Sequence, residues 1–498
     1  MVALEEHYVQ CEPEDDGRGL VLLQIDGLSY DTLARAMEEG YAPNLSRLAQ
    51  SEDYDLSPFF SGIPAETLPV LNNIFYGERI PANDWYSKAR GEHIDSIPYE
   101  AEVRERAAER GELGLMHDGA TYLSPICGGA EKVGITVSTL KEEQAEKGMF
   151  RTLAKEAWND IKLIWRSDES ITGTLYNLVR DFFSSRSYLK EHDQWNSWWD
   201  QHYPYLITMA DNVFPTVATE GVKEAMEQGL PVAYVDYTSY DERAHFYGTE
   251  CTEALESLSI VDKKIGEIVD KVEREGLQYD IVVLSDHGQT PSVQFKEIFG
   301  KPIQEAIYDM AREADPSTDV KDGDIQVAHA YSMANVYFDQ LPGTASLADV
   351  KELYPGLVDA LVQHPSMGFV VGRTDDGIVV QGREGSVSIT QDGLTVEGDD
   401  PLAPYGDTAF LAEILRDYST IDETGDLVLV STYAGDRIID FNDVYSMVSL
   451  HGGLGGPQTR PFILAPRKLG LDVDETTVPM DLYEPLKRLK ERHSGADA

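Results

Sequence analysis

Short apolar runs that end at a carboxylate constrain the fold of this chain more than any other feature. The clearest runs span residues 19–25, 231–235 and 281–284, and they lead into Asp26, Asp236 and Ser285-Asp286-His287. Strands that are apolar along their whole length are typical of a parallel sheet covered on both faces. Helical periodicity between the runs, as over residues 253–275, predicts a doubly wound α/β fold with a mostly parallel central sheet. Ligands of such sheets bind beyond the carboxyl ends of the strands.

The chain of 498 residues is long enough for several ordinary domains or for one α/β domain with large insertions. We expect a catalytic core in three parts, residues 17–149, 206–345 and 426–475. Residues 150–205 are helical in pattern and rich in tryptophan, which predicts a helical cap insertion. Residues 346–425 contain short β-like runs broken by Gly and Asp, which predicts a small β-containing insertion. Residues 476–498 are interpreted as a C-terminal tail.

The charge of the chain is strongly acidic, with 88 Asp and Glu against 41 Lys and Arg and a formal net charge of −47. This excess is spread along the whole sequence, and it argues against binding to nucleic acid or anionic lipid. It favours a halophilic protein, with an ordinary acidic cytosolic enzyme as the alternative. The three cysteines, Cys11, Cys127 and Cys251, have no metal-ligand or redox spacing. Because neither a signal peptide nor a transmembrane run is visible, we expect a cytoplasmic protein, with its oligomeric state open.

Residues with metal-binding or nucleophilic side chains gather in five short segments. Their members are Asp26, Thr67 within Pro64-Ala65-Glu66-Thr67-Leu68-Pro69, Asp241 with His245, Asp286 with His287, and His451. Each has an ordinary structural explanation when taken alone, such as a helix cap for Asp26. Together, three carboxylates and three imidazoles are the oxygen and nitrogen donors that two Zn²⁺ sites with open positions require. His329 and Asp236 are weaker candidates, and packing is the simpler explanation for His329.

The order of these segments resembles that of the alkaline phosphatase superfamily, whose fold agrees with the α/β prediction. The stretch from Pro64 to Tyr76-Gly77 is similar to the Pro-Thr-x-Thr-Phe-Pro…Thr-Gly signature of its type I nucleotide pyrophosphatase/phosphodiesterase branch. The resemblance covers residues 19–90, 230–340 and 426–466 and leaves both insertions outside.

The resemblance implies a set of roles for the site residues. One divalent metal would be held by Asp26, Asp286 and His287 beside the nucleophile Thr67, and a second by Asp241, His245 and His451. The ions would be Zn²⁺, with Mn²⁺ or Fe as alternatives. An Asn that binds the phosphoryl oxygen would align near Lys88, with Asn83 and Asn73 as nearby substitutes. A Lys at that position would favour a dianionic monoester.

The implied activity is metal-dependent hydrolysis of a small-molecule phosphate ester, either a phosphodiester or a nucleotide pyrophosphate, through a phospho-threonine intermediate. Three alternatives remain open at this point. The same two-metal site could serve a phosphomonoesterase or phosphonate hydrolase, or a mutase that retains the phosphorylated intermediate. The chain could also be a catalytically silent binding protein that keeps the fold.

Overall fold

The computed structural model describes residues 18–134, 171–191, 198–317, 319–444 and 447–493. Cys11 and three tryptophans of the predicted cap, Trp158, Trp165 and Trp195, lie outside these ranges. Two helices of the predicted cap region are described, α7 (Ile171–Glu191) and α8 (Trp198–Asn212). Among the described helices, none has the length and apolar character that crossing a bilayer requires.

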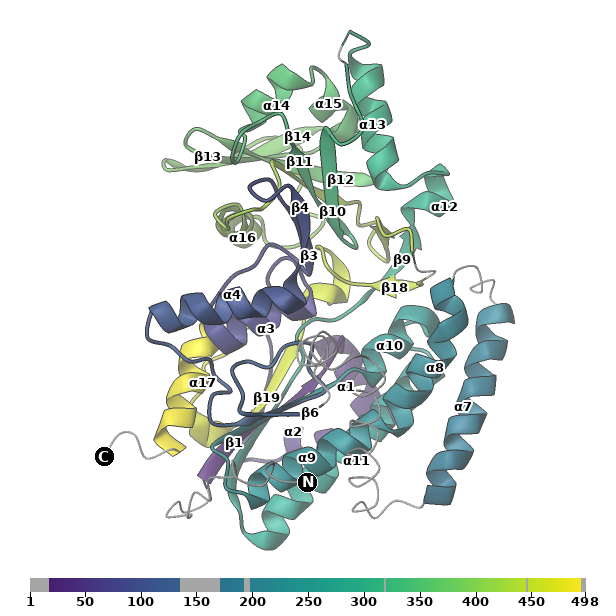
Figure 1. The fold of residues 1–498 in the computed structure, drawn as a ribbon, viewed down its shortest axis with the longest axis vertical. Helices are drawn as coiled ribbons and strands as arrows, with labels where there is room; N and C mark the ends of the chain where they lie inside the picture. Colours follow the sequence, from purple (N-terminus) through teal and green to yellow (C-terminus); the bar gives the residue numbers. More distant parts are fainter. Residues whose placement is uncertain (1–17, 135–170, 192–197, 318, 445–446, 494–498) are drawn as a thin grey trace, which may run out of the picture.

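A seven-stranded, mostly parallel sheet forms the lower half of the molecule (Figure 1), as the sequence predicts. Its order is β2 (Tyr54–Pro58), β19 (Phe462–Pro466), β8 (Gln278–Leu284), β1 (Arg18–Ile25), β7 (Val232–Tyr237), β5 (Ala120–Tyr122) and β6 (Lys132–Gly134). The five strands from β8 to β6 run parallel, whereas β19 pairs antiparallel with both β8 and β2. The apolar runs of the sequence therefore lie side by side, and their polar ends meet at one edge.

Helices cover both faces of this sheet, because alternate residues of its strands point to opposite sides. In β1, Val21 and Leu23 join one apolar cluster, while Leu20 and Leu22 join the other. The first cluster includes residues of α1 (Tyr30–Glu39), α2 (Pro43–Ala49), α9 (Phe214–Glu227) and α11 (Thr252–Glu275). The second includes residues of α3 (Thr67–Tyr76), α4 (Ser96–Glu109) and α17 (Pro479–His493). The fold is thus doubly wound around a buried sheet.

A second sheet of seven antiparallel strands lies in the upper half of Figure 1. Its order is β10 (Ile325–Ala330), β11 (Met333–Phe338), β16 (Leu427–Ser431), β12 (Met367–Thr374), β13 (Gly377–Gln381), β14 (Gly385–Thr390) and β15 (Gly393–Gly398). Residues of α13 (Ile303–Ala314), α14 (Leu347–Leu353) and α15 (Leu357–Gln363) pack in one apolar cluster at this sheet, and residues of α16 (Thr408–Tyr418) in another.

The second sheet differs in extent from the small insertion expected over residues 346–425. Strands β10 and β11 precede residue 346 and β16 follows residue 425, yet all three belong to this sheet. The reason is pairing across those positions, since β16 bonds to β11 on one side and to β12 on the other.

The remaining described elements of the two halves are short. They are the hairpin β3 (Asp84–Ser87) and β4 (Glu92–Asp95), helices α10 (Ser239–Tyr247) and α12 (Phe295–Phe299), and the sheet of β17 (Ile438–Asp440), β9 (Thr290–Gln294) and β18 (Ser449–Leu450). Two 3₁₀ turns, Gly456–Thr459 and Arg467–Leu469, flank β19.

Candidate active site

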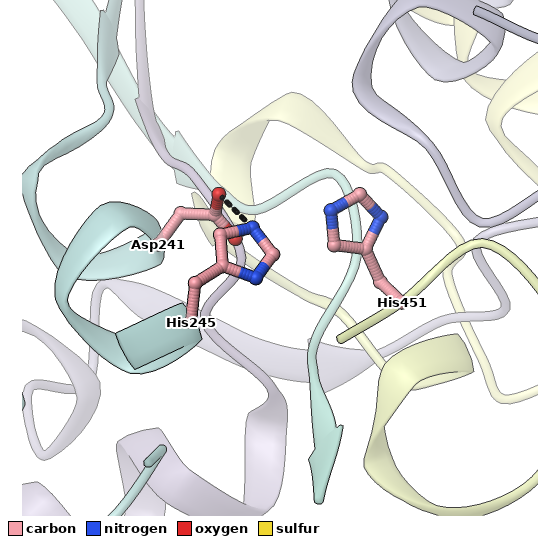
Figure 2. A group of neighbouring side chains, drawn as sticks. All are labelled: Asp241, His245 and His451. Carbon is pink, nitrogen blue, oxygen red and sulfur yellow. Dashed lines mark ion pairs between the residues drawn. The ribbon is translucent and has the colours of Figure 1, made fainter. Parts of the chain in front are cut away.

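The carboxyl ends of three adjacent strands bring the predicted ligands together. Asp26 follows β1, Asp286 and His287 follow β8, and these two strands are neighbours in the sheet. Helix α10, which comes soon after β7, carries Asp241 and His245 one turn apart. His451 follows β18 and arrives from the opposite side of the site (Figure 2).

The six residues form two groups, each able to hold one ion. The ligand atoms of Asp241, His245 and His451 all lie within 4.8 Å of one another, and so do those of Asp26, Asp286 and His287. All six side chains are buried. The two groups are the same sets that the sequence resemblance implies.

In all three histidines a backbone carbonyl lies beside Nδ1, so Nε2 is the atom on the side of the other ligand residues. The Nδ1 atom of His245 lies 2.8 Å from the carbonyl oxygen of Ser449, that of His451 lies 2.8 Å from Ala65, and that of His287 lies 3.0 Å from Gly288. A carbonyl only accepts, so Nδ1 carries the proton in each ring. Such a bond fixes the tautomer and ring orientation that metal-binding histidines need.

The carboxylates also fit a bound cation. Asp26 Oδ1 and Asp286 Oδ2 are buried and have no hydrogen-bond partner among the described residues. Burial, together with the negative charges of Asp286 and Asp241, raises the pKa of Asp26 well above its usual value. A buried carboxylate in this state needs a positive partner or a proton, and a divalent ion supplies the former.

In the second group, the side chains shift one another's pKa values. Burial acts to raise the pKa of Asp241, but His245 outweighs it and holds the pKa below its usual range, since the two side chains lie 3.0 Å apart. Burial and the neighbouring His287 lower the pKa of His451, whose ring stacks on that of His287 at 3.8 Å between centroids. A low pKa keeps His451 neutral, which is the form that binds metals.

Thr67 lies where a nucleophile would be required. It is the first residue of α3, and its Oγ1 atom is 3.3 Å from Nε2 of His287. The partial positive charge at a helix N-terminus favours an anion there. Asn83 is held beside it: the amide N–H of Leu68 donates to Asn83 Oδ1 at 3.2 Å, and the N–H of Asn83 donates to Glu66 Oε2 at 2.8 Å.

A cavity of about 540 Å³ opens over these groups. Its lining comprises Asp26, Thr67, Leu68, Asn83, Leu123, Ser124, Pro125, Tyr203, Asp236, Thr238, Asp241, Glu242, His245, Phe246, Tyr331, Met447 and His451. The floor therefore contains members of both ligand groups and the predicted nucleophile.

Ser124, Thr238 and Glu242 are polar residues of this lining that go beyond the sequence-based site, in which Asp236 was only a weaker candidate. Ser124 Oγ and Asp236 Oδ2 are buried without a partner among the described residues. The signal for Asp236 was present, because it ends an apolar run as Asp26 does. Ser124 follows β5, whose three residues are too few to show a strand period.

Comparison with known proteins agrees with this geometry. Residues 127–363 match the family model for type I phosphodiesterase / nucleotide pyrophosphatase. This match, over just under half of the chain, makes the chain similar to a branch of the alkaline phosphatase superfamily. Members of this superfamily use divalent metals and hydrolyse phosphate esters or phosphonates.

Individual relatives of the superfamily are distant. Alkaline phosphatase PhoK of Sphingomonas sp is 24% identical over 98 residues, which is 20% of this chain and 17% of that protein. The structure of phosphonoacetate hydrolase from Sinorhizobium meliloti in complex with phosphonoformate matches with a TM-score of 0.52 and 15% identity, over 95% of each chain. Wild-type alkaline phosphatase PafA matches with a TM-score of 0.54 and 12% identity, over 96% of each chain. At these identities the two structures establish the fold.

Of the three predicted substrate contacts, only Asn83 lines the cavity. Asn73 lines a separate cavity of about 210 Å³, together with Pro69 and Arg79. Lys88 Nζ lies 2.9 Å from Oδ2 of the buried Asp426. The resemblance aligned Lys88 with a phosphoryl-binding Asn, but the turn after β3 directs it toward Asp426, which precedes β16 of the second sheet.

A buried ion pair fastens the helix that carries Asp241 and His245. Arg243 Nε donates to Asp211 Oδ2 at 2.9 Å, and Asp211 Oδ1 accepts from Ser257 Oγ at 2.8 Å. These contacts tie α10 to α8 and α11. At the start of α10, Ser239 Oγ donates to the backbone carbonyl of Ala210 at 2.6 Å.

Lys88→Met should lower the free energy of unfolding by about 3–5 kcal/mol, because it leaves Asp426 buried without its cation. The amide N–H groups of Phe338 and Ala345, each 2.8 Å from Asp426, would be its remaining partners. Denaturant unfolding measures the loss. Lys301→Met removes a half-exposed pair with Asp309 and should cost only about 0–1 kcal/mol. A stable Lys88→Met protein with a raised KM would instead make Lys88 a substrate contact.

Arg243→Met should weaken metal binding at the Asp241, His245 and His451 group by about 10- to 100-fold, as loss of an orienting residue does elsewhere. Equilibrium dialysis against buffered zinc, followed by metal analysis, would show one ion lost before the other. Arg274→Met, which changes an exposed side chain of α11, is the matched control. Unchanged affinity for both ions would show that the Arg243–Asp211 pair does not orient α10.

Proposed function

We propose that this chain is a metal-dependent phosphodiesterase that also accepts nucleotide pyrophosphates and works through a covalent phospho-threonine at Thr67. The observation that carries the proposal is the position of Thr67 Oγ1. It lies at the N-terminus of α3, 3.3 Å from His287, in the cavity whose floor holds both ligand groups.

The two ligand groups would each hold one divalent ion, zinc by the donor set, with manganese or iron as alternatives. Bound there, the ions would supply Lewis-acid stabilisation of the phosphoryl oxygens and lower the pKa of the attacking hydroxyl groups.

The chain's own residues account for positioning. Thr67 Oγ1 forms a bond to phosphorus as the bond to the leaving oxygen breaks, and water then cleaves the phospho-threonine and restores the threonine hydroxyl. Asn83 uses its Oδ1 atom to accept from Leu68, so its Nδ2 hydrogens remain to donate to a non-bridging oxygen. A donor fixed before substrate arrives is the kind that stabilises developing negative charge.

The charge of the lining favours a diester over a monoester. Among the described residues that line the cavity there is no Lys or Arg, whereas Asp236 and Glu242 add carboxylates beyond the two ligand groups. A phosphate monoester is dianionic near neutral pH and a diester is monoanionic. The second charge of a monoester would have no cationic side chain to pair with. A preference for a monoester would require the charge of Lys88, and that side chain is paired with Asp426.

The zinc-loaded protein should hydrolyse bis(nitrophenyl) phosphate with a kcat/KM about 10- to 100-fold above that for nitrophenyl phosphate, since an unpaired charge costs about 1–3 kcal/mol. Chelation should abolish both rates, and added Zn²⁺ should restore them. A monoester preference would favour the phosphomonoesterase alternative. Retention of the phosphoryl group, without release of free phosphate product, would favour a mutase.

Thr67→Ala should reduce kcat for the diester by about 1,000-fold or more, because the nucleophile is removed. Both metal ions should remain bound, since the six ligand side chains are unchanged. Thr67→Ser keeps a hydroxyl and should retain most of the rate. Trapping of labelled phosphate on the native chain, and its absence from Thr67→Ala, would identify the covalent intermediate. Full activity of Thr67→Ala would show that another group attacks phosphorus.

A further inference from the structure

The two carboxylate oxygens of Asp241 have different neighbours. Oδ2 lies 3.0 Å from Nε2 of His245, within the second ligand group (Figure 2). Oδ1 instead accepts a hydrogen bond from Nε2 of Gln289 at 2.5 Å. The same amide nitrogen donates to the backbone carbonyl of Asp241 at 3.0 Å. Both N–H bonds of the Gln289 amide are therefore used to hold a single ligand residue.

The orientation of the Gln289 amide follows from the chemistry of its partner. A carboxylate oxygen and a backbone carbonyl both accept hydrogen bonds, so the amide nitrogen is the atom that must face Asp241. The other half of the amide, Oε1, is buried without a partner among the described residues, on a side chain that is 1% exposed. A buried carbonyl without a hydrogen bond is costly. Gln289 keeps its hold on Asp241 in spite of that cost.

Gly27 provides the space that Oδ1 of Asp241 occupies. Its backbone has a φ of +70°, and a Cβ atom at this position would overlap that oxygen, so any side chain here would displace the carboxylate. The N–H of Gly27 donates to Oδ1 of Asp286 at 3.3 Å, while Oδ2 of Asp286 lies 3.3 Å from Nε2 of His287. In both ligand groups, one oxygen of a carboxylate is thus engaged by a protein donor and the other lies beside an imidazole.

This engagement limits what Asp241 can offer to an ion. A carboxylate binds a metal through one oxygen or through both. With Oδ1 held by Gln289, only Oδ2 remains, and it joins the two imidazoles of the group to make three protein donors. Three donors leave the open position that a hydrolytic metal site requires.

We propose that Gln289 is a positioning residue whose amide reserves Oδ1 of Asp241, so that Asp241 presents one oxygen to the ion of the second group. The inference rests on the proposed two-metal function and adds how the chain keeps a coordination position open. Gln289 is not part of the described cavity lining, so it acts through Asp241 and not on the substrate. It lies two residues after His287, so the segment that supplies two ligands of the first group also restrains a ligand of the second.

Gln289→Met tests the inference, because it removes both N–H donors and keeps a neutral side chain of similar length. The affinity of the second group for zinc should fall by about 10- to 100-fold, while that of the first group should not change. Equilibrium dialysis against buffered zinc, followed by metal analysis, measures both affinities. The His245→Ala variant lacks a ligand of the second group, so the ion that it retains identifies the first group.

Cobalt spectroscopy gives a readout that a purely structural role would not alter. Co²⁺ in place of zinc reports its coordination, because four-coordinate Co²⁺ absorbs visible light more strongly than six-coordinate Co²⁺. In Gln289→Met, Asp241 is free to bring its second oxygen to the ion. The visible absorption of the ion in the second group should therefore lose intensity. A side chain that served packing alone would leave the spectrum of the bound ion unchanged.

Two further variants complete the experiment. Gln278→Met, which changes an exposed glutamine at the start of β8, is the matched control and should keep both affinities and the native spectrum. Gln289→Asn keeps the amide but ends one bond short of Asp241, so it carries the same test if Gln289→Met does not fold. Unchanged affinity of the second group, or equal weakening of both groups, would overturn the inference.

These measurements do not depend on turnover. A native protein that binds both ions but hydrolyses no phosphodiester would refute the proposed function, and the dialysis and the cobalt spectra would still decide the role of Gln289.

Discussion

The concentration of buried carboxylates at one edge of the central sheet is the constraint on which this structure depends. Asp26 and Asp286 end neighbouring strands, and Asp236 ends the strand on the other side of β1. Burial and mutual repulsion raise the pKa of both Asp26 and Asp236 well above the usual range. A parallel sheet forces such an arrangement, because all its carboxyl ends point the same way. A cation bound at this edge would therefore offset the repulsion between these carboxylates.

The histidines show how distant parts of the chain are held around that edge. Each imidazole donates its Nδ1 proton to a backbone carbonyl, and two of these bonds join segments far apart in sequence. His451 bonds to Ala65, two residues before Thr67, and His245 bonds to Ser449, two residues before His451. The nucleophile helix, α10 and the strand before His451 are thus linked through the rings that would bind metal. Loosening any one of these segments would move a ligand of the second group.

The sequence predicted those parts of the structure that a single pattern of residues determines. The apolar runs predicted the parallel strands, because a strand buried on both faces has no polar positions to confuse the pattern. The resemblance to the alkaline phosphatase superfamily implied both ligand groups, and the structure brings the same residues together. Asn83 was one of three candidates, and its place in the cavity lining and its hydrogen bonds to Leu68 and Glu66 distinguish it.

The failures have physical causes of their own. Lys88 was chosen because it aligns with a phosphoryl-binding Asn of the superfamily, but a hairpin reverses direction within a few residues, so alignment alone does not give side-chain position. The second sheet was underestimated because β11 and β16 are joined by pairing between segments about ninety residues apart. Ser124 and Glu242 carry no pattern at all. They are brought into the cavity lining only by the folded arrangement.

The carboxylates of this protein fall into two sets, which act on a substrate at different distances. Most of the 88 acidic residues contribute a diffuse field, which salt screens within about a nanometre or less at physiological ionic strength. The carboxylates in the cavity act at contact distance, where screening by salt is weak. Salt would therefore ease the arrival of an anionic phosphate ester while leaving selection inside the cavity largely intact. So acidic a surface is compatible with binding a phosphate group, provided the attraction is confined to the ligand groups and the N-terminus of α3.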